Sequence, residues 1–145
     1  MFQKKQIFTA EQKEQIVGAI REAEKVTSGQ IKVHLEAKCS KDALERAVEV
    51  FHHLGIHKTR QHNGVLIYIA WRDQKFAIIG DSGINSVVPA NFWDGTKEVM
   101  KGHFAKGGFL EGILFAINET GSHLEQYFPP QADGKNELSD EISEG

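Results

Sequence analysis

Residues 63–83 read NGVLIYIAWRDQKFAIIGDSG, and the predicted sheet can be built outward from them. The continuous apolar run 65–71 is typical of a central strand that is buried on both faces. Arg72-Asp73-Gln74 predicts a hairpin turn, and residues 76–79 predict the returning strand, which ends at Gly80-Asp81-Ser82-Gly83. The stretch therefore predicts an antiparallel pair of strands.

A further strand and two helices are predicted before this pair. Apolar and polar residues alternate over 31–36, which indicates a half-buried strand. Thr9 and Gln12 form a capping box at the start of a first helix, and an apolar stripe over 44–54 predicts a second. Because the second helix joins two strands, those strands should be parallel, with a right-handed crossover.

Two more helices are predicted after the hairpin, at about 93–104 and 110–128. Gly107-Gly108 separates them, and Gly121 is expected to bend the second. The order helix–strand–helix–strand–strand–helix–helix predicts an α/β fold, a three-layer α/β/α sandwich with a small mixed sheet. Residues 1–130 should form a single domain, and residues 131–145 an acidic C-terminal tail.

Composition and charge exclude several classes of protein. The 145 residues contain no apolar run as long as a membrane span, and the N-terminus lacks the apolar region of a secretory signal. The single cysteine, Cys39, rules out an internal disulfide, so a cytoplasmic location is expected. Five acids and one base give residues 131–145 a net charge of -4, which leaves +1 for the rest of a chain of -3. A near-neutral body gives no electrostatic footprint for nucleic acid.

The acidic C-terminal run is typical of a solvated tail. It nevertheless carries Leu138 and Ile142 four residues apart, which leaves open that a short segment docks on the body.

The predicted topology brings three loops to one edge of the sheet, at residues 27–30, 59–64 and 80–83. They carry a carboxylate, amides, hydroxyls and glycine backbone, and oxygen donors of this kind suit a hard cation such as Ca²⁺ or Mg²⁺. The predicted metal ligands are Asp81, Asn63 and Asp94. The predicted pocket or anion-binding residues are Ser28, Gly29, Gln30, Arg60, Gly64, Ser82 and Gly83.

Two other interpretations stay open. Gly80-Asp81-Ser82-Gly83 is also a good turn without a ligand. The opposite edge of the sheet, near Glu36 and Asp73, competes because open α/β sheets bind ligands at the carboxyl ends of their strands. No nucleophile motif, P-loop or dinucleotide fingerprint is present.

The ordered motifs 27–31, 63–67 and 80–84, followed by Trp93, Phe104 and Gly108-x-x-x-Gly112, resemble the TPM domain family of bacterial and chloroplast proteins, often labelled phosphatases. The resemblance covers about residues 6–130, and small free-standing bacterial members can end in a tail like residues 136–142. It implies an α/β/α sandwich with a loop pocket at one sheet edge. It also implies binding of divalent cations, chiefly Ca²⁺, in some members, and an acid phosphatase activity claimed for a plant member.

The chain departs from the family pattern at two acidic positions. Gln30 replaces the usual glutamate, and Phe8-Thr9 stand where an aspartate is usual before the first helix. Fewer carboxylates predict weaker Ca²⁺ binding and leave no obvious general acid–base pair. The favoured function is divalent-cation binding around Asp81 without catalysis. The alternative is a metal-dependent acid phosphatase acting on phosphomonoesters, in which Arg60 holds the phosphate.

Overall fold

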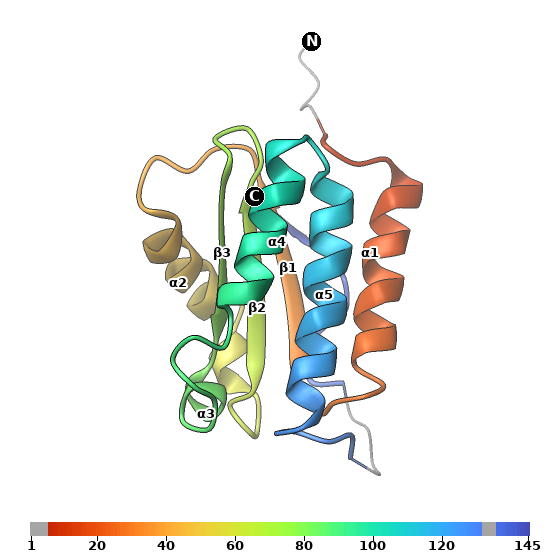
Figure 1. The fold of residues 1–145 in the computed structure, drawn as a ribbon, viewed down its shortest axis with the longest axis vertical. Coiled ribbons are helices and arrows are strands. Elements are labelled where there is room, and N and C mark those ends of the chain that lie inside the picture. The colour runs from red at the N-terminus through yellow and green to blue at the C-terminus, as the bar shows by residue number, and fades with distance from the viewer. Residues whose placement is uncertain (1–5, 132–135) are drawn as a thin grey trace.

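The computed structural model describes residues 6–131 and 136–145 of the chain (Figure 1). Its helices are α1 (Ala10–Ala23), α2 (Ala43–His53), the 3-10 helix η1 (Ile56–Lys58), α3 (Ser82–Asn85), α4 (Asp94–Ala105) and α5 (Phe109–Glu125). Its strands are β1 (Gln30–Glu36), β2 (Gly64–Ala70), β3 (Lys75–Gly80) and β4 (Ser143–Glu144). The predicted α/β class is confirmed, and η1, α3 and β4 are additions to the predicted elements.

The sheet is mixed and has the strand order β3-β2-β1-β4. β1 runs parallel to β2 in the register Ile31–Val65 to Glu36–Ala70, and β3 returns antiparallel to β2. Every residue of β2 is buried, as the apolar run predicted. The prediction that β1 is half-buried is wrong: all of its residues except Lys32 are buried, because residues 136–145 cover its polar side chains. The parallel pair and the hairpin thus follow from the sequence pattern.

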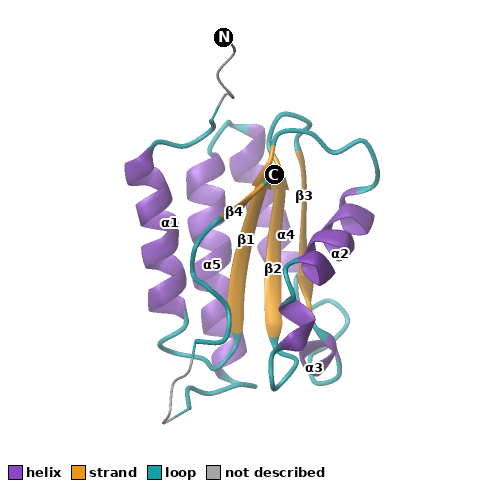
Figure 2. Cartoon of the chain, turned by 180° about the vertical axis from the view of Figure 1, so that it is seen from behind, coloured by secondary structure: helices purple, strands orange, loops and turns teal. Residues whose placement is uncertain are grey.

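Helices cover both faces of the sheet. α1, α4 and α5 lie on one face, and α2 with η1 lies on the other (Figures 1 and 2). The larger core includes Ile20, Val33, Ile67 and Ile117, and the smaller core under α2 includes Phe51 and Leu66. Alternate residues of β2 therefore point into the two cores, which is the three-layer arrangement.

Two local features position the helices that cover the larger core. Thr9 Oγ1 accepts the Gln12 N–H at 3.1 Å and Gln12 Oε1 accepts the Thr9 N–H at 2.9 Å, which completes the predicted capping box. α5 continues through Gly121, where a Cβ would lie 2.8 Å from Ala23 Cβ. This glycine therefore allows α1 and α5 to approach closely.

Residues 136–145 dock along the sheet. β4 extends the sheet in parallel to β1, with His34 opposite Ser143 and Leu35 opposite Glu144. Leu138 packs against the smaller core and Ile142 against the larger one. The docking that the sequence left open is therefore present in this segment, whereas residues 132–135 of the predicted tail lie outside the described residues.

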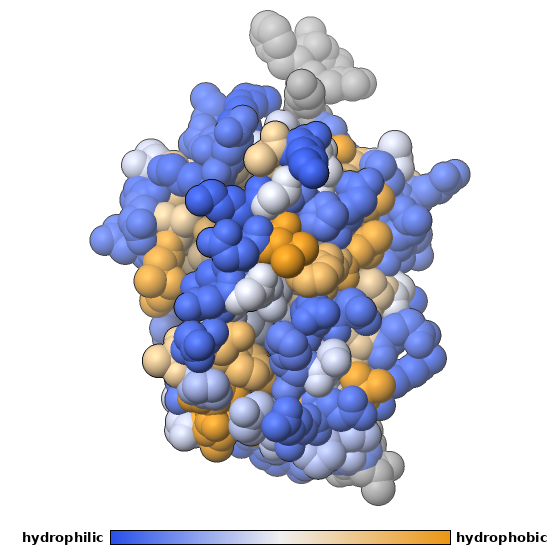
Figure 3. Space-filling view, in the orientation of Figure 1, coloured by the Kyte–Doolittle hydropathy of each residue, from blue (hydrophilic) through white to orange (hydrophobic). Residues whose placement is uncertain are grey.

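The face seen in Figure 3 is mostly hydrophilic, with small hydrophobic patches between hydrophilic residues. Within the described ranges, none of the helices combines the length and apolar character needed to cross a membrane.

Candidate functional site

The α1–β1 loop and the loop before β2 meet at Ser28. Its hydroxyl oxygen accepts one hydrogen bond from Gln61 Nε2 and one from Asn63 Nδ2, both at 3.3 Å. The backbone N–H of Gln30 donates to the carbonyl of Asn63 at 3.3 Å. The predicted convergence of these two loops is therefore present.

The loop after β3 joins the loop before β2 through its backbone. Asp81 N–H donates to the carbonyl of Gly64, and Gly83 N–H to that of His62, both at 2.9 Å. A Cβ on Gly83 would lie 2.3 Å from the carbonyl oxygen of Gln61, so this position needs a residue without a side chain. Gly83 thus allows these two loops to pack closely, whereas Gly64, where a Cβ would lie 2.4 Å from Ile56 Cγ2, allows close packing against η1.

Three buried oxygen atoms in these loops have no hydrogen-bond partner within residues 6–131 and 136–145: Asp81 Oδ2, Asn63 Oδ1 and Thr59 Oγ1. The loops that carry Asp81 and Asn63 are joined by the Asp81–Gly64 hydrogen bond. The other carboxylate oxygen of Asp81 accepts the Ser82 N–H at 2.7 Å and caps α3. His62 Nδ1 lies 3.5 Å from Asp81 Oδ2, which is an ion pair only when the histidine is protonated. Buried acceptors without donors are rare, and they indicate a place for a cation or a water molecule.

In the part of the chain that the structure describes, no hydrogen bond or ion pair links Asp94 to these loops. It is exposed in the first turn of α4, where its charge complements the helix dipole. Among the described residues, no three His, Cys, Asp or Glu side chains are grouped as a metal site would need. Any cation at Asp81 would therefore rely on neutral oxygen atoms as well.

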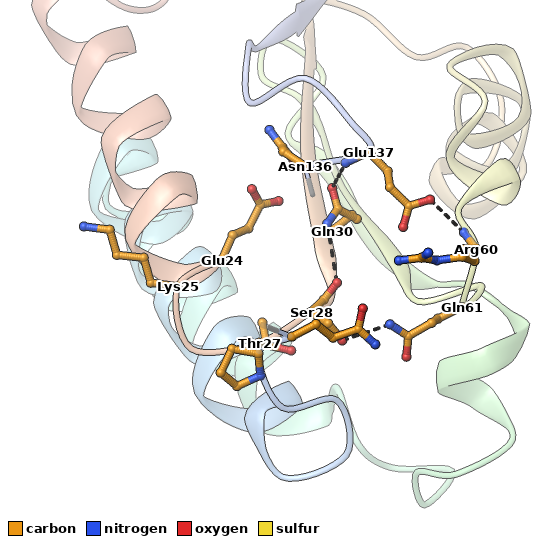
Figure 4. A pocket seen from close by; sticks show the side chains of 11 residues that line it. Glu24, Lys25, Thr27, Ser28, Gln30, Arg60, Gln61, Asn136 and Glu137 are labelled. Atoms are coloured by element: carbon orange, nitrogen blue, oxygen red, sulfur yellow. Dashed lines mark hydrogen bonds between the residues drawn. The ribbon is translucent and has the colours of Figure 1, made fainter. Parts of the chain in front are cut away.

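A cavity of about 290 Å³ opens beside Ser28 (Figure 4). Of the predicted pocket residues, it is lined by Ser28, Gln30 and Arg60. The remaining lining residues are Glu24, Lys25, Thr27, Gln61, Pro130, Gln131, Asn136 and Glu137. Gly29, Gly64, Ser82 and Gly83 do not line it, so the predicted residues divide between this cavity and the Asp81 loops.

The C-terminal segment forms one wall of the cavity. Gln30 Oε1 accepts the backbone N–H groups of Glu137 and Leu138 at 3.0 Å each. The carboxylate of Glu137 accepts the Arg60 N–H at 2.8 Å (Figure 4). The Asn-Glu-Leu motif in the tail was the signal that could have placed these residues here.

Glu24, which lines this cavity, has a strongly raised pKa. Burial, followed by a hydrogen bond with Asp140, raises the pKa of Glu24 to about 9, although its Oε2 accepts the Ile31 N–H at 2.9 Å. Glu24 is therefore protonated at neutral pH and links α1 to the C-terminal segment.

The opposite edge of the sheet holds a closed polar network around Glu36. Its carboxylate accepts hydrogen bonds from Arg46 Nε at 2.9 Å, Arg46 Nη2 at 3.0 Å and the Tyr68 hydroxyl. His34 Nε2 lies 3.0 Å from the same carboxylate. Although burial alone would raise the pKa of Glu36, these hydrogen bonds lower it to about 2. With its acceptor positions filled, Glu36 has a structural role.

Known proteins similar to this chain show its family. No curated protein matches the chain. A solved structure, the NMR structure of the BA42 protein from the psychrophilic bacterium Bizionia argentinensis, is similar at 45% identity and a TM-score of 0.92, and the match covers 100% of both chains. The model of the TPM domain, whose label includes the word phosphatase, matches residues 1–123. The chain therefore belongs to the TPM domain family.

Proposed function

We propose that the loops around Asp81 bind a divalent cation, Ca²⁺ or Mg²⁺, in a domain without catalytic activity. The observation that carries this proposal is the pair of buried, unpartnered oxygen atoms, Asp81 Oδ2 and Asn63 Oδ1. A buried carboxylate oxygen without a donor costs free energy, and a cation would remove that cost.

The donor set fits a hard cation. Ca²⁺ and Mg²⁺ prefer carboxylate, amide and backbone carbonyl oxygens, which these loops supply. Of the two predicted carboxylate ligands, only Asp81 lies in these loops. A bound cation would therefore keep water molecules as ligands and bind weakly. Cys39 is buried and unpaired, which supports a reducing, cytoplasmic setting for this function.

Asp81→Asn should weaken Ca²⁺ or Mg²⁺ binding at least tenfold. Asparagine keeps an oxygen that can cap α3 but removes the charge that attracts the cation. The measurement is an amide-resolved NMR titration of the full chain, in which saturable shifts are expected at residues 28–30, 60–64 and 81–83.

Asp94→Asn is the matched control, because this exposed carboxylate lies outside the loops. It should leave the titration unchanged. Shifts confined to the acidic residues of the C-terminal segment, or equal binding by wild type and Asp81→Asn, would refute the proposed cation site.

A metal-dependent phosphatase acting on phosphomonoesters is the second candidate. It is favoured by the cavity beside Ser28, which Lys25 and Arg60 line and which could hold a phosphate. The cation would polarise a phosphoryl oxygen. Hydrolysis of a phosphomonoester by the wild-type chain, absent in Asp81→Asn, would establish this activity. Equal rates for the two proteins would mark a contaminating enzyme.

A further inference from the structure

The edge of β1 that pairs with β4 holds an extended segment of the same chain, residues 136–145. Three β1 side chains that alternate along the strand hold residues 136–145. Gln30 accepts two backbone N–H groups, and Lys32 Nζ donates to the carbonyls of Ser139 at 3.1 Å and Glu141 at 2.7 Å. His34 Nδ1 lies 2.8 Å from Ser143 Oγ. Recognition is thus mostly of backbone groups, as in the addition of a strand to a sheet edge.

Apolar side chains give the surface its selectivity. Leu138 packs against the core under α2, and Ile142 against the core under α1 and α5. At the end of the segment, Gly145 N–H donates to the carbonyl of Leu35 at 2.9 Å. A Cβ on Gly145 would lie 2.8 Å from Glu36 Oε1, so the surface takes a residue without a side chain there.

Charge adds a third element of recognition. Lys13 Nζ lies 3.1 Å from Glu144 Oε2, and Arg21 Nε lies 3.6 Å from Asp140 Oδ2. Lys13 and Arg21 of α1 and Lys32 of β1 thus present three basic side chains to an acidic segment. The fitting ligand is therefore an extended acidic peptide with a leucine and an isoleucine four residues apart and a glycine beyond them.

The same contacts hold the segment only lightly. β4 has two residues, Leu138 and Ile142 are only half-buried, and one partner of each ion pair, Glu144 or Arg21, is exposed. Exposed ion pairs stabilise little. The segment can therefore leave while the body, whose cores are made by the other strands and helices, stays folded. Release uncovers a strand edge, which is a template for pairing with another chain.

We propose that the β1 edge is a self-association site, which takes residues 136–145 of a second copy of this chain in exchange for its own. A second copy carries the same segment, so its residues 136–145 would make the same contacts with the β1 edge. Reciprocal exchange would therefore restore all of these contacts in both copies. The exchanged pair would also build the cavity wall of each copy from the Asn136 and Glu137 of the other.

The test uses two full-length variants that fail in complementary ways. Lys32→Glu repels the acidic segment and leaves that segment intact. The double variant Leu138→Asp, Ile142→Asp loses its own apolar anchors and leaves the β1 edge intact. Each variant alone should be monomeric by light scattering. Mixing them at micromolar concentrations should double the measured mass, because the intact segment of one binds the intact edge of the other.

A chain with all three substitutions is the matched control, and it should form no complex with either variant or with itself. Circular dichroism checks that each chain is folded. If Lys32→Glu does not fold, a synthetic peptide of residues 136–145 replaces it and should shift the β1 amides of the double variant saturably. Persistent monomers in the mixture of folded variants, or no shift with the peptide, would overturn the proposal.

Discussion

Glu36→Ala should lower the free energy of unfolding by about 3–5 kcal/mol. Glu36 is 7% exposed, and its carboxylate accepts hydrogen bonds from Arg46 and Tyr68 and pairs with His34. Alanine leaves the buried Tyr68 hydroxyl and His34 without their acceptor and the partly exposed Arg46 without its counter-charge, and each loss destabilises the folded chain. Chemical denaturation followed by circular dichroism measures the loss.

The dependence of the free energy of unfolding on pH in the acid range gives an independent check. The pKa of Glu36 is about 2 in the folded chain, against 4.5 for an ordinary glutamate. Its contribution is therefore present above pH 4.5 and lost as the pH falls through 2. The Glu36→Ala chain should lack this dependence. Glu49→Gln, which changes an exposed partner of Arg46, is the control and should behave as wild type. Equal loss in both variants would contradict a special role for Glu36.

Glu24→Gln should have the opposite sign and raise the free energy of unfolding at pH 7 by about 1–3 kcal/mol. Burial and Asp140 raise the pKa of Glu24 to about 9, so folding at neutral pH costs the uptake of a proton. A glutamine amide can accept the Ile31 N–H and donate to Asp140 without that cost. Denaturation across a series of pH values measures the difference.

The pH profile follows from the same reasoning. Asp140 of the C-terminal segment and Lys32 of β1 face Glu24, and Arg21 of α1 lies near Asp140. Because the folded pKa is raised, the contribution of Glu24 is complete below pH 4.5 and is lost as the pH rises through 9. The profile of Glu24→Gln should be flatter over this range. Glu22→Gln, on the exposed side of the helix, should keep the wild-type slope. A wild-type slope in Glu24→Gln would disprove the raised pKa.

Most of the fold can be predicted from sequence because its signals are local. The apolar run of β2, the alternation of β1 and the capping box of α1 each act within a few residues, and the hairpin fixes the direction of β3. Gly121 shows the limit of this reasoning. Its expected effect was a bend, whereas its contact with Ala23 depends on the packing of α5 against α1, which no local pattern contains.

The candidate site was predictable only in its position. Topology brings the loops at Ser28, Asn63 and Asp81 together, and the structure joins them by hydrogen bonds. Local sequence patterns do not predict the docking of the C-terminal segment, because β4 has two residues and gives no periodic signal. Gln30 illustrates the consequence: the family pattern indicates only a missing carboxylate at this position, yet the side-chain oxygen of Gln30 accepts the backbone N–H groups of residues 137 and 138.

The pairing of β4 with β1 also bears on synthesis of the chain. His34 and Ser143, which meet across this pair, are 109 residues apart in the sequence. A ribosome therefore finishes β1, β2 and β3 long before it releases the residues that cover the β1 edge. Throughout that interval each nascent chain presents an unpaired strand edge to its neighbours. Aggregation during rapid expression should accordingly begin at β1.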